Sequence, residues 1–131
     1  MVFSMFKIMP FLYLLSYGIV LAFGQVLFKM SSNQVDNIDL FSLASISKLI
    51  TQPCFILACS VYGLSTLAWV GILARVNLVI AYPFVISTSL LATSLIGVFA
   101  FGEEVNSYTF ISYALIICAL VTLSKGIIGN V

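Results

Sequence analysis

The charged residues of this chain are few, and they leave four uncharged runs that are each long enough to cross a bilayer. Five Lys or Arg and four Asp or Glu are distributed over 131 residues. An ionised group at the bilayer centre costs at least ~2.5 kcal/mol, so charges mark where a chain leaves the membrane. A helix needs about 20 apolar residues to span the hydrocarbon. The uncharged intervals therefore predict four transmembrane spans, at residues 8–28, 49–74, 76–102 and 105–124.

The predicted fold is an all-α membrane protein with four transmembrane helices, forming a single domain over residues 1–131. The helices are expected at about 8–29, 50–74, 78–101 and 107–127, and the last two connections are short enough to make the helices they join antiparallel neighbours. The polar segment 31–47 is predicted to be a solvated loop. Within it, the pattern Leu40, Phe41, Leu43 and Ile46 fits a short interfacial helix.

The composition argues against several functional classes. The net charge of +1, without a run of Lys or Arg, provides no basic surface that would bind nucleic acid. The chain has no His, and Cys54, Cys59 and Cys118 lie within apolar runs without paired spacing, so neither a metal site nor any other cofactor is expected. Glu103 and Glu104 are adjacent, which on a helix points them about 100° apart. We find no catalytic constellation and expect that the protein is not an enzyme.

A polar stripe marks the end of the first span. Gln25 and Lys29 are separated by one helical turn, and Gly18 and Ala22 lie on the same face. Gln25 both donates and accepts hydrogen bonds, and the Lys29 ammonium presents three donors suited to a phosphate or a headgroup. The alternative is that Gln25 joins helices and that Lys29 extends to the membrane surface without binding anything.

The second and third spans carry aromatic and hydroxyl groups. Tyr62 and Trp69 fall in the middle of the second span, where interfacial anchoring explains them poorly; they predict either an aromatic groove or ordinary helix packing. Tyr82 and Pro83 begin the third span, in which Pro83 predicts either a bend with a freed carbonyl or a helix that starts close to it. The third span also contains several hydroxyl side chains, among which we single out Ser87 and Ser94 as candidate binding residues.

A strip of small residues follows one face of the fourth span. It consists of Ala114, Cys118, Thr122 and Gly126, which recur every four residues. Small side chains let helices approach closely in a bilayer. The strip therefore predicts a packing face, either within the bundle or between two copies.

Three short motifs in this order resemble the drug/metabolite transporter superfamily in its four-helix, EamA-like form. They are Gly-Gln-Val-Leu-Phe-Lys at 24–29, Ala-Tyr-Pro-Phe at 81–84 and Phe-Gly-Glu at 101–103. The pattern is most similar to subunits of the flippase for undecaprenyl phosphate-linked aminoarabinose. The resemblance implies a small-multidrug-resistance-like bundle that works as a homodimer or heterodimer around a membrane chamber. It also implies that Gln25 and Lys29 lie near the lipid-phosphate path, Tyr82 and Pro83 on the chamber lining, and Glu103 in an external loop.

The chain departs from the proton-coupled multidrug branch, because residues 8–28 contain no acid to exchange a cation for protons. We therefore expect a transporter or flippase subunit for a polyprenyl-phosphate-linked sugar or a similar amphiphile, in contact with membrane lipid. The alternatives are an exporter of small solutes or cations with the same fold, and an accessory membrane protein that transports nothing. A bacterial inner membrane is implied by the resemblance. Cytoplasmic termini are favoured by three basic residues against two, with dual insertion as the alternative.

Overall fold

The computed structural model describes the backbone of residues 2–35 and 42–129, and the side chains of residues 9–35 and 42–125. This part of the chain is helical and contains no strand. It has five helices: α1 (Val2–Asn33), α2 (Leu43–Ile50), α3 (Pro53–Leu73), α4 (Leu78–Phe101) and α5 (Ser107–Gly129). Four of them, all except α2, are long and apolar enough to cross a membrane. The predicted all-α fold with four spanning helices is confirmed, and the protein is an integral membrane protein.

Local sequence signals account for where the helices begin and end. Pro53 occupies the first turn of α3, where its missing N–H leaves no hydrogen bond unmade. Gly102 ends α4 in the left-handed region at φ 66°, which glycine adopts without strain. Asn106 precedes α5, and its Oδ1 accepts a hydrogen bond from the Thr109 amide at 2.8 Å. These caps leave only short connections between α3, α4 and α5.

Two expectations about local structure are resolved by the helix bounds. Pro83 is the sixth residue of α4, so it lies inside the helix and not in its first turn. A proline there cannot donate to the carbonyl one turn earlier, which leaves that carbonyl free. The expected interfacial helix is represented by α2, which includes Leu43 and Ile46, whereas Leu40 and Phe41 lie outside the described residues.

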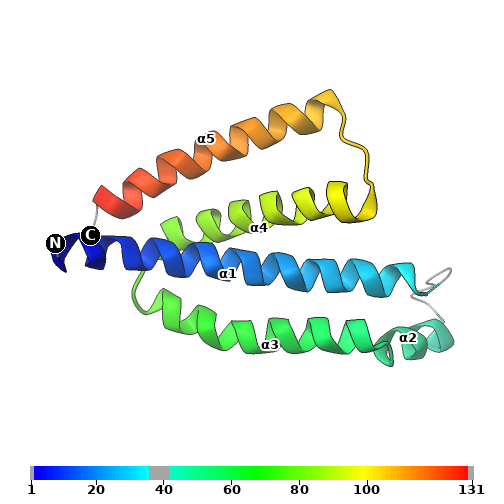
Figure 1. The fold of residues 1–131 in the computed structure, drawn as a ribbon. Helices are drawn as coiled ribbons and strands as arrows, with labels where there is room; N and C mark the ends of the chain where they lie inside the picture. Colours follow the sequence, from blue (N-terminus) through cyan, green and yellow to red (C-terminus); the bar gives the residue numbers. More distant parts are fainter. Residues whose placement is uncertain (1, 36–41, 130–131) are drawn as a thin grey trace.

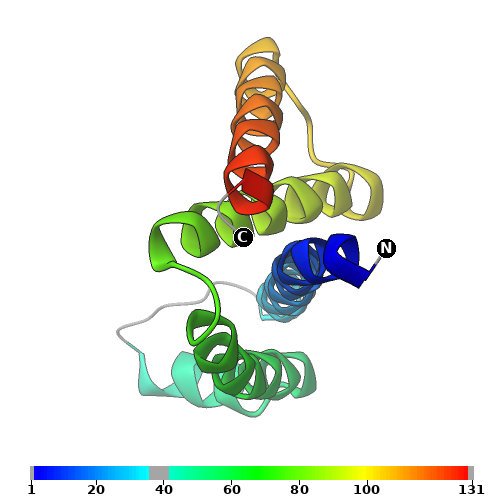
Figure 2. The same cartoon turned by 90° about the vertical axis from the view of Figure 1, so that its left-hand side faces the viewer.

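Helix α1 lies between α3 and α4 and packs against both (Figures 1 and 2). The buried core joins α1 to α4 through Leu14, Ala81, Phe84 and Val85, and the ring of Phe11 packs edge-on against Phe84 with centroids 5.2 Å apart. Helix α5 lies beyond α4 and diverges from it toward the Ser107 end (Figure 1). None of the spanning part of α5 is fully buried. The chain therefore presents a three-helix core with α5 on its outside.

The two ends of the bundle carry different groups. Because α1 and α4 run in opposite senses to α3 and α5, the end of α1, α2 and the end of α4 lie together (Figure 1). The connection between α3 and α4, which contains Arg75, lies at the other end with the two termini (Figure 1). Lys29 and Glu103 are thus at one membrane face and Arg75 is at the opposite face.

Candidate substrate chamber

A chamber of about 380 Å³ lies between the final turns of α1 and α4. It gathers three residues that the sequence singled out, namely Gln25 and Lys29 from α1 and Glu103 from the connection after α4. Its remaining walls come from the apolar side chains of Val26, Phe28 and Phe101, together with Ser32, Thr93 and Gly97. A cavity with a few convergent polar groups in an apolar wall is the usual form of a small-molecule site.

The charged centre of the chamber is an ion pair between Lys29 and Glu103. Lys29 Nζ lies 2.9 Å from Glu103 Oε1, and the two side chains are 48% and 52% exposed. It is the one ion pair among the residues whose side chains the structure describes. A pair that is half exposed contributes at most about 1 kcal/mol to stability, so its charges remain open to exchange with another ion.

The position of Glu103 follows from the way α4 ends. The amides of Gly102 and Glu103 both donate to the carbonyl of Gly97, which turns the chain back over the last turn of the helix. The Glu103 carboxylate then lies against Gly97, where a Cβ atom would be only 2.8 Å from Oε2. Two glycines therefore bring this acid to Lys29, one through its positive φ and the other through its missing side chain.

A second polar contact links α1 to α3 beside the chamber. Gln25 Nε2 donates a hydrogen bond of 2.6 Å to Tyr62 Oη, and Tyr62 Oη is 3.5 Å from the carbonyl of Leu21, at the limit of a hydrogen bond. The Tyr62 ring fits because Gly24 has no side chain; a Cβ there would lie 2.6 Å from the ring. Gln25 joins these helices, as one sequence interpretation had it, and also lines the chamber.

Thr93 is a chamber residue that the sequence interpretation did not select. It lies one turn before Gly97 on α4, and its Oγ1 is buried without a hydrogen-bond partner. A buried hydroxyl without a partner costs about 1–3 kcal/mol, a cost that a hydrogen bond to a ligand would offset. Its spacing of one helical turn from Gly97 could have identified Thr93 in the sequence. The many other hydroxyl side chains on this helix made it indistinguishable from its neighbours.

Trp69 and Tyr82 form a separate aromatic cluster away from the chamber. Trp69 stacks on Tyr17 of α1 with centroids 5.2 Å apart and an interplanar angle of 21°. The Tyr82 ring of α4 also contacts this indole, with centroids 6.4 Å apart and an interplanar angle of 60°. Trp69 therefore packs between α1 and α4. Pro83 is exposed beside Tyr82.

The other predicted residues do not join the chamber. Ser87 and Ser94 are half-buried on α4 and are not among the residues that line it. Ala114, Cys118 and Thr122 are exposed on α5, opposite the face whose Leu120 and Leu123 pack on the core. The described part of the strip is therefore not buried by any of the residues that the structure describes. Gly126 lies on α5, and its burial is outside what the structure describes.

The described residues contain no group of His, Cys, Asp or Glu that could hold a metal ion. Comparisons with protein families, with curated proteins and with solved structures found no match to this chain. The geometry of the chamber is therefore the basis on which a function is proposed.

Proposed function

We propose that this protein is a subunit of a membrane transporter or flippase that moves a polyprenyl-phosphate-linked sugar, or a similar anionic amphiphile, between leaflets. The observation that carries the proposal is the chamber between α1 and α4, where a half-exposed ammonium stands beside an amide and an unpartnered hydroxyl. This set suits a ligand with one anionic group and several hydroxyls. An apolar tail would stay in the surrounding lipid.

The ion pair supplies the means of exchange. An arriving phosphate competes with the Glu103 carboxylate for Lys29, and a phosphate binds an ammonium at least as well as a carboxylate does. When the cargo leaves, Glu103 returns to Lys29, so the ammonium is never without a counter-ion. Gln25 and Thr93 lie within the same chamber and would hydrogen-bond sugar hydroxyls.

A second subunit fits this proposal. The chamber is only partly enclosed, and the small-residue strip of α5 is exposed, so another four-helix unit would have both a face to pack on and a cavity to close. We propose a homodimer or a heterodimer in a bacterial inner membrane, with the termini in the cytoplasm. In that orientation the Lys29–Glu103 pair lies at the outer face.

Transport of a labelled lipid tests the proposal. Purified protein is reconstituted into vesicles that contain a polyprenyl phosphate carrying a fluorophore, and an impermeant reductant bleaches the fluorophore in the outer leaflet. We expect bleaching to exceed one half of the signal when the protein is present. Lys29→Ala should abolish this excess while leaving insertion intact, because the chamber loses its only cation.

Lys48→Ala is the matched control, because Lys48 is exposed on α2 at the same end of the bundle but outside the chamber. Its flux should equal that of the unaltered protein. If Lys29→Ala retained full flux, Lys29 would have no part in transport. If the unaltered protein moved no lipid, either alone or together with a second four-helix subunit, the accessory-protein alternative would be favoured.

A further inference from the structure

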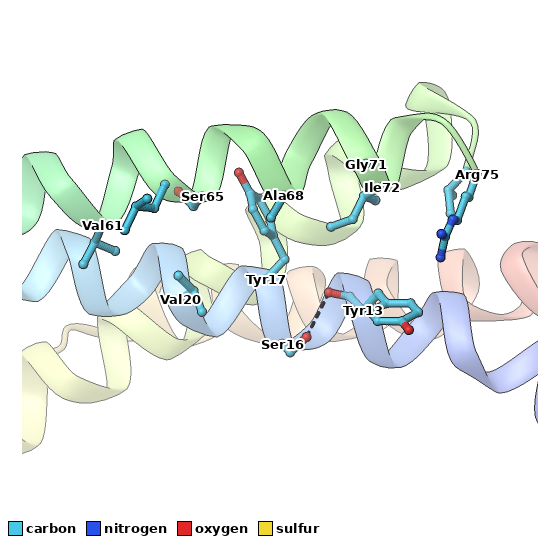
Figure 3. Close-up of a pocket in the computed structure, with 12 residues that line it drawn as sticks. Tyr13, Ser16, Tyr17, Val20, Val61, Ser65, Ala68, Gly71, Ile72 and Arg75 are labelled. Atoms are coloured by element: carbon cyan, nitrogen blue, oxygen red, sulfur yellow. Dashed lines mark hydrogen bonds between the residues drawn. The ribbon is translucent and has the colours of Figure 1, made fainter.

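A second and larger cavity lies between α1 and α3, toward the end of the bundle opposite the chamber. Its volume is about 630 Å³, and it is walled mainly by apolar side chains together with the hydroxyl-bearing residues Tyr13, Ser16, Tyr17 and Ser65. We call it the Arg75 groove, because Arg75 is the one charged residue that lines it (Figure 3). The groove and the chamber share helix α1 but have no lining residue in common.

The Arg75 side chain extends from the end of α3 toward α1, on the side where Tyr13 lies (Figure 3). No residue that lines the groove is acidic, and Arg75 takes part in no ion pair among the described residues. A guanidinium at the edge of the hydrocarbon is attracted to phosphate and can hold it through two parallel hydrogen bonds. The charge at the mouth of the groove therefore lacks a partner within the described part of the chain.

We propose that the Arg75 groove binds an anionic glycerophospholipid of the adjacent leaflet, with its phosphate on Arg75 and one acyl chain in the groove. The groove lining on α3 runs from Val61 to Ile72 and covers about 17 Å at 1.5 Å per residue, which exceeds the roughly 15 Å depth of one leaflet. An ordinary acyl chain attached to a headgroup at Arg75 therefore fits the groove lengthwise. A polyprenyl chain is much longer than this.

The absence of acid from the lining also selects among headgroups. A zwitterionic lipid such as phosphatidylcholine brings an ammonium that would find no carboxylate in the groove. Phosphatidylglycerol brings a net negative charge and hydroxyls, and the hydroxyl-bearing Tyr13 lies on the Arg75 side of the groove in Figure 3. Charge complementarity thus favours the anionic lipid. This site does not depend on the proposed transport function.

Native mass spectrometry of the full-length protein in mild detergent tests the inference. Phosphatidylglycerol and phosphatidylcholine are added in equal amounts, and the retained lipid is identified by mass. We expect one phosphatidylglycerol per chain to be retained preferentially. Arg75→Ala should weaken its retention about tenfold, and Arg75→Lys should restore part of the preference, because the charge remains but the paired hydrogen bonds do not.

Two further variants distinguish lipid binding in the groove from general attraction of lipid to the basic residues at this membrane face. Gly71 lines the groove, and a Cβ atom there meets no other atom within 4 Å, so Gly71→Leu should fill the groove without distorting the helix and should reduce retention as strongly as Arg75→Ala. Lys125 is an exposed cation near the end of α5, at the same end of the bundle but outside the groove. Lys125→Ala should retain phosphatidylglycerol fully.

Three results would overturn the inference. Equal retention of phosphatidylglycerol and phosphatidylcholine would show that Arg75 does not select a headgroup. If Arg75→Ala and Lys125→Ala lost phosphatidylglycerol to the same extent, the lipid would be attracted nonspecifically to a basic surface. Preference for a polyprenyl phosphate over phosphatidylglycerol in an equimolar mixture would assign the groove to transported cargo. Loss of flux through the chamber would leave the lipid preference unchanged, so the two proposals fail independently.

Discussion

At the scale of single residues, the chamber depends on how Glu103 is held beside Lys29. The pair joins charges from the end of α1 and from the connection after α4, and neither side chain is fully buried. Two glycines set the geometry, since Gly102 turns the chain and Gly97 leaves room for the carboxylate. The attraction is weak enough to be exchanged, which is what a binding site for an anion requires.

Removing the negative charge from Glu103 should make Lys29 a better anion site. We expect Glu103→Gln to tighten the binding of dodecyl phosphate about threefold to tenfold, because the phosphate no longer competes with a carboxylate for the ammonium. Isothermal titration calorimetry in a neutral detergent measures the affinity. The free energy of unfolding should change by less than about 1 kcal/mol, since the ion pair is half exposed.

Glu104→Gln is the control for this change, because Glu104 is exposed and takes part in no ion pair among the described residues. It alters the net charge by the same amount at the neighbouring position. Equal affinities for the two variants would mean that long-range charge, and not the contact with Lys29, governs anion binding.

At the scale of helices, α1 is the element around which the others pack. Its buried side includes Gly18, Ala22 and Gly24, and small residues of this kind let α3 and α4 approach closely from either side. At Gly18 a Cβ atom would lie 2.8 Å from Thr88 Cβ and 3.1 Å from the carbonyl oxygen of Val85. The second of these is backbone, so it cannot rotate away as a side chain would.

A methyl group at Gly18 should therefore force α1 and α4 apart. We expect Gly18→Ala to destabilise the protein by about 1–3 kcal/mol, the usual cost of overpacking a close contact. Thermal unfolding in detergent, followed by circular dichroism, measures the loss.

Gly63→Ala is the matched substitution, because a Cβ atom at Gly63 on α3 meets no atom within 4 Å. This variant should be as stable as the unaltered protein or more stable by about 0.5–1 kcal/mol, since alanine favours a helix over glycine. If the two variants unfolded at the same temperature, close packing at Gly18 would have no role in stability.

At the scale of the whole molecule, the chain is an incompletely buried bundle. Helix α5 packs on the core through one side only, with Leu120 and Leu123, and leaves Ala114, Cys118 and Thr122 exposed. The chamber is open as well. Both features are expected of a subunit that packs against a second subunit, and they support the dimer in our proposed function.

A bulky side chain on the exposed strip should prevent that association. We expect Cys118→Trp to convert a dimer into a monomer, because the small side chain that permits close helix contact is lost. Size-exclusion chromatography with light scattering measures the protein mass in detergent. The variant should keep its helical content, since Cys118 contacts solvent or lipid in the single chain.

Leu67→Trp places the same bulk at a lipid-exposed position of α3, where Leu67 is 73% exposed, and should leave the mass unchanged. A monomer in the unaltered protein, under conditions that preserve other membrane dimers, would contradict the dimer proposal. A dimer that persists in Cys118→Trp would place the interface on another face.

What the sequence determined by itself is the set of membrane spans. The cost of burying a charge and the apolar length needed to cross a bilayer are both local quantities. The charged residues that bound the uncharged runs were therefore sufficient to predict four helices; they are Lys7, Lys29, Lys48, Arg75, Glu103, Glu104 and Lys125. The motifs also identified Gln25, Lys29 and Glu103 as polar groups of interest. Alternation of the spans already implied that Lys29 and Glu103 reach the same membrane face.

Only the tertiary structure decided which of these residues meet. Lipid is as apolar as leucine, so the hydropathy of a spanning helix does not say which face turns toward a neighbour. The Lys29–Glu103 contact, the place of Thr93 in the chamber and the exposure of the α5 strip all depend on how the helices are rotated and packed. The Arg75 groove depends on it too, since its lining comes from two helices whose sequences carry no mark of their common face.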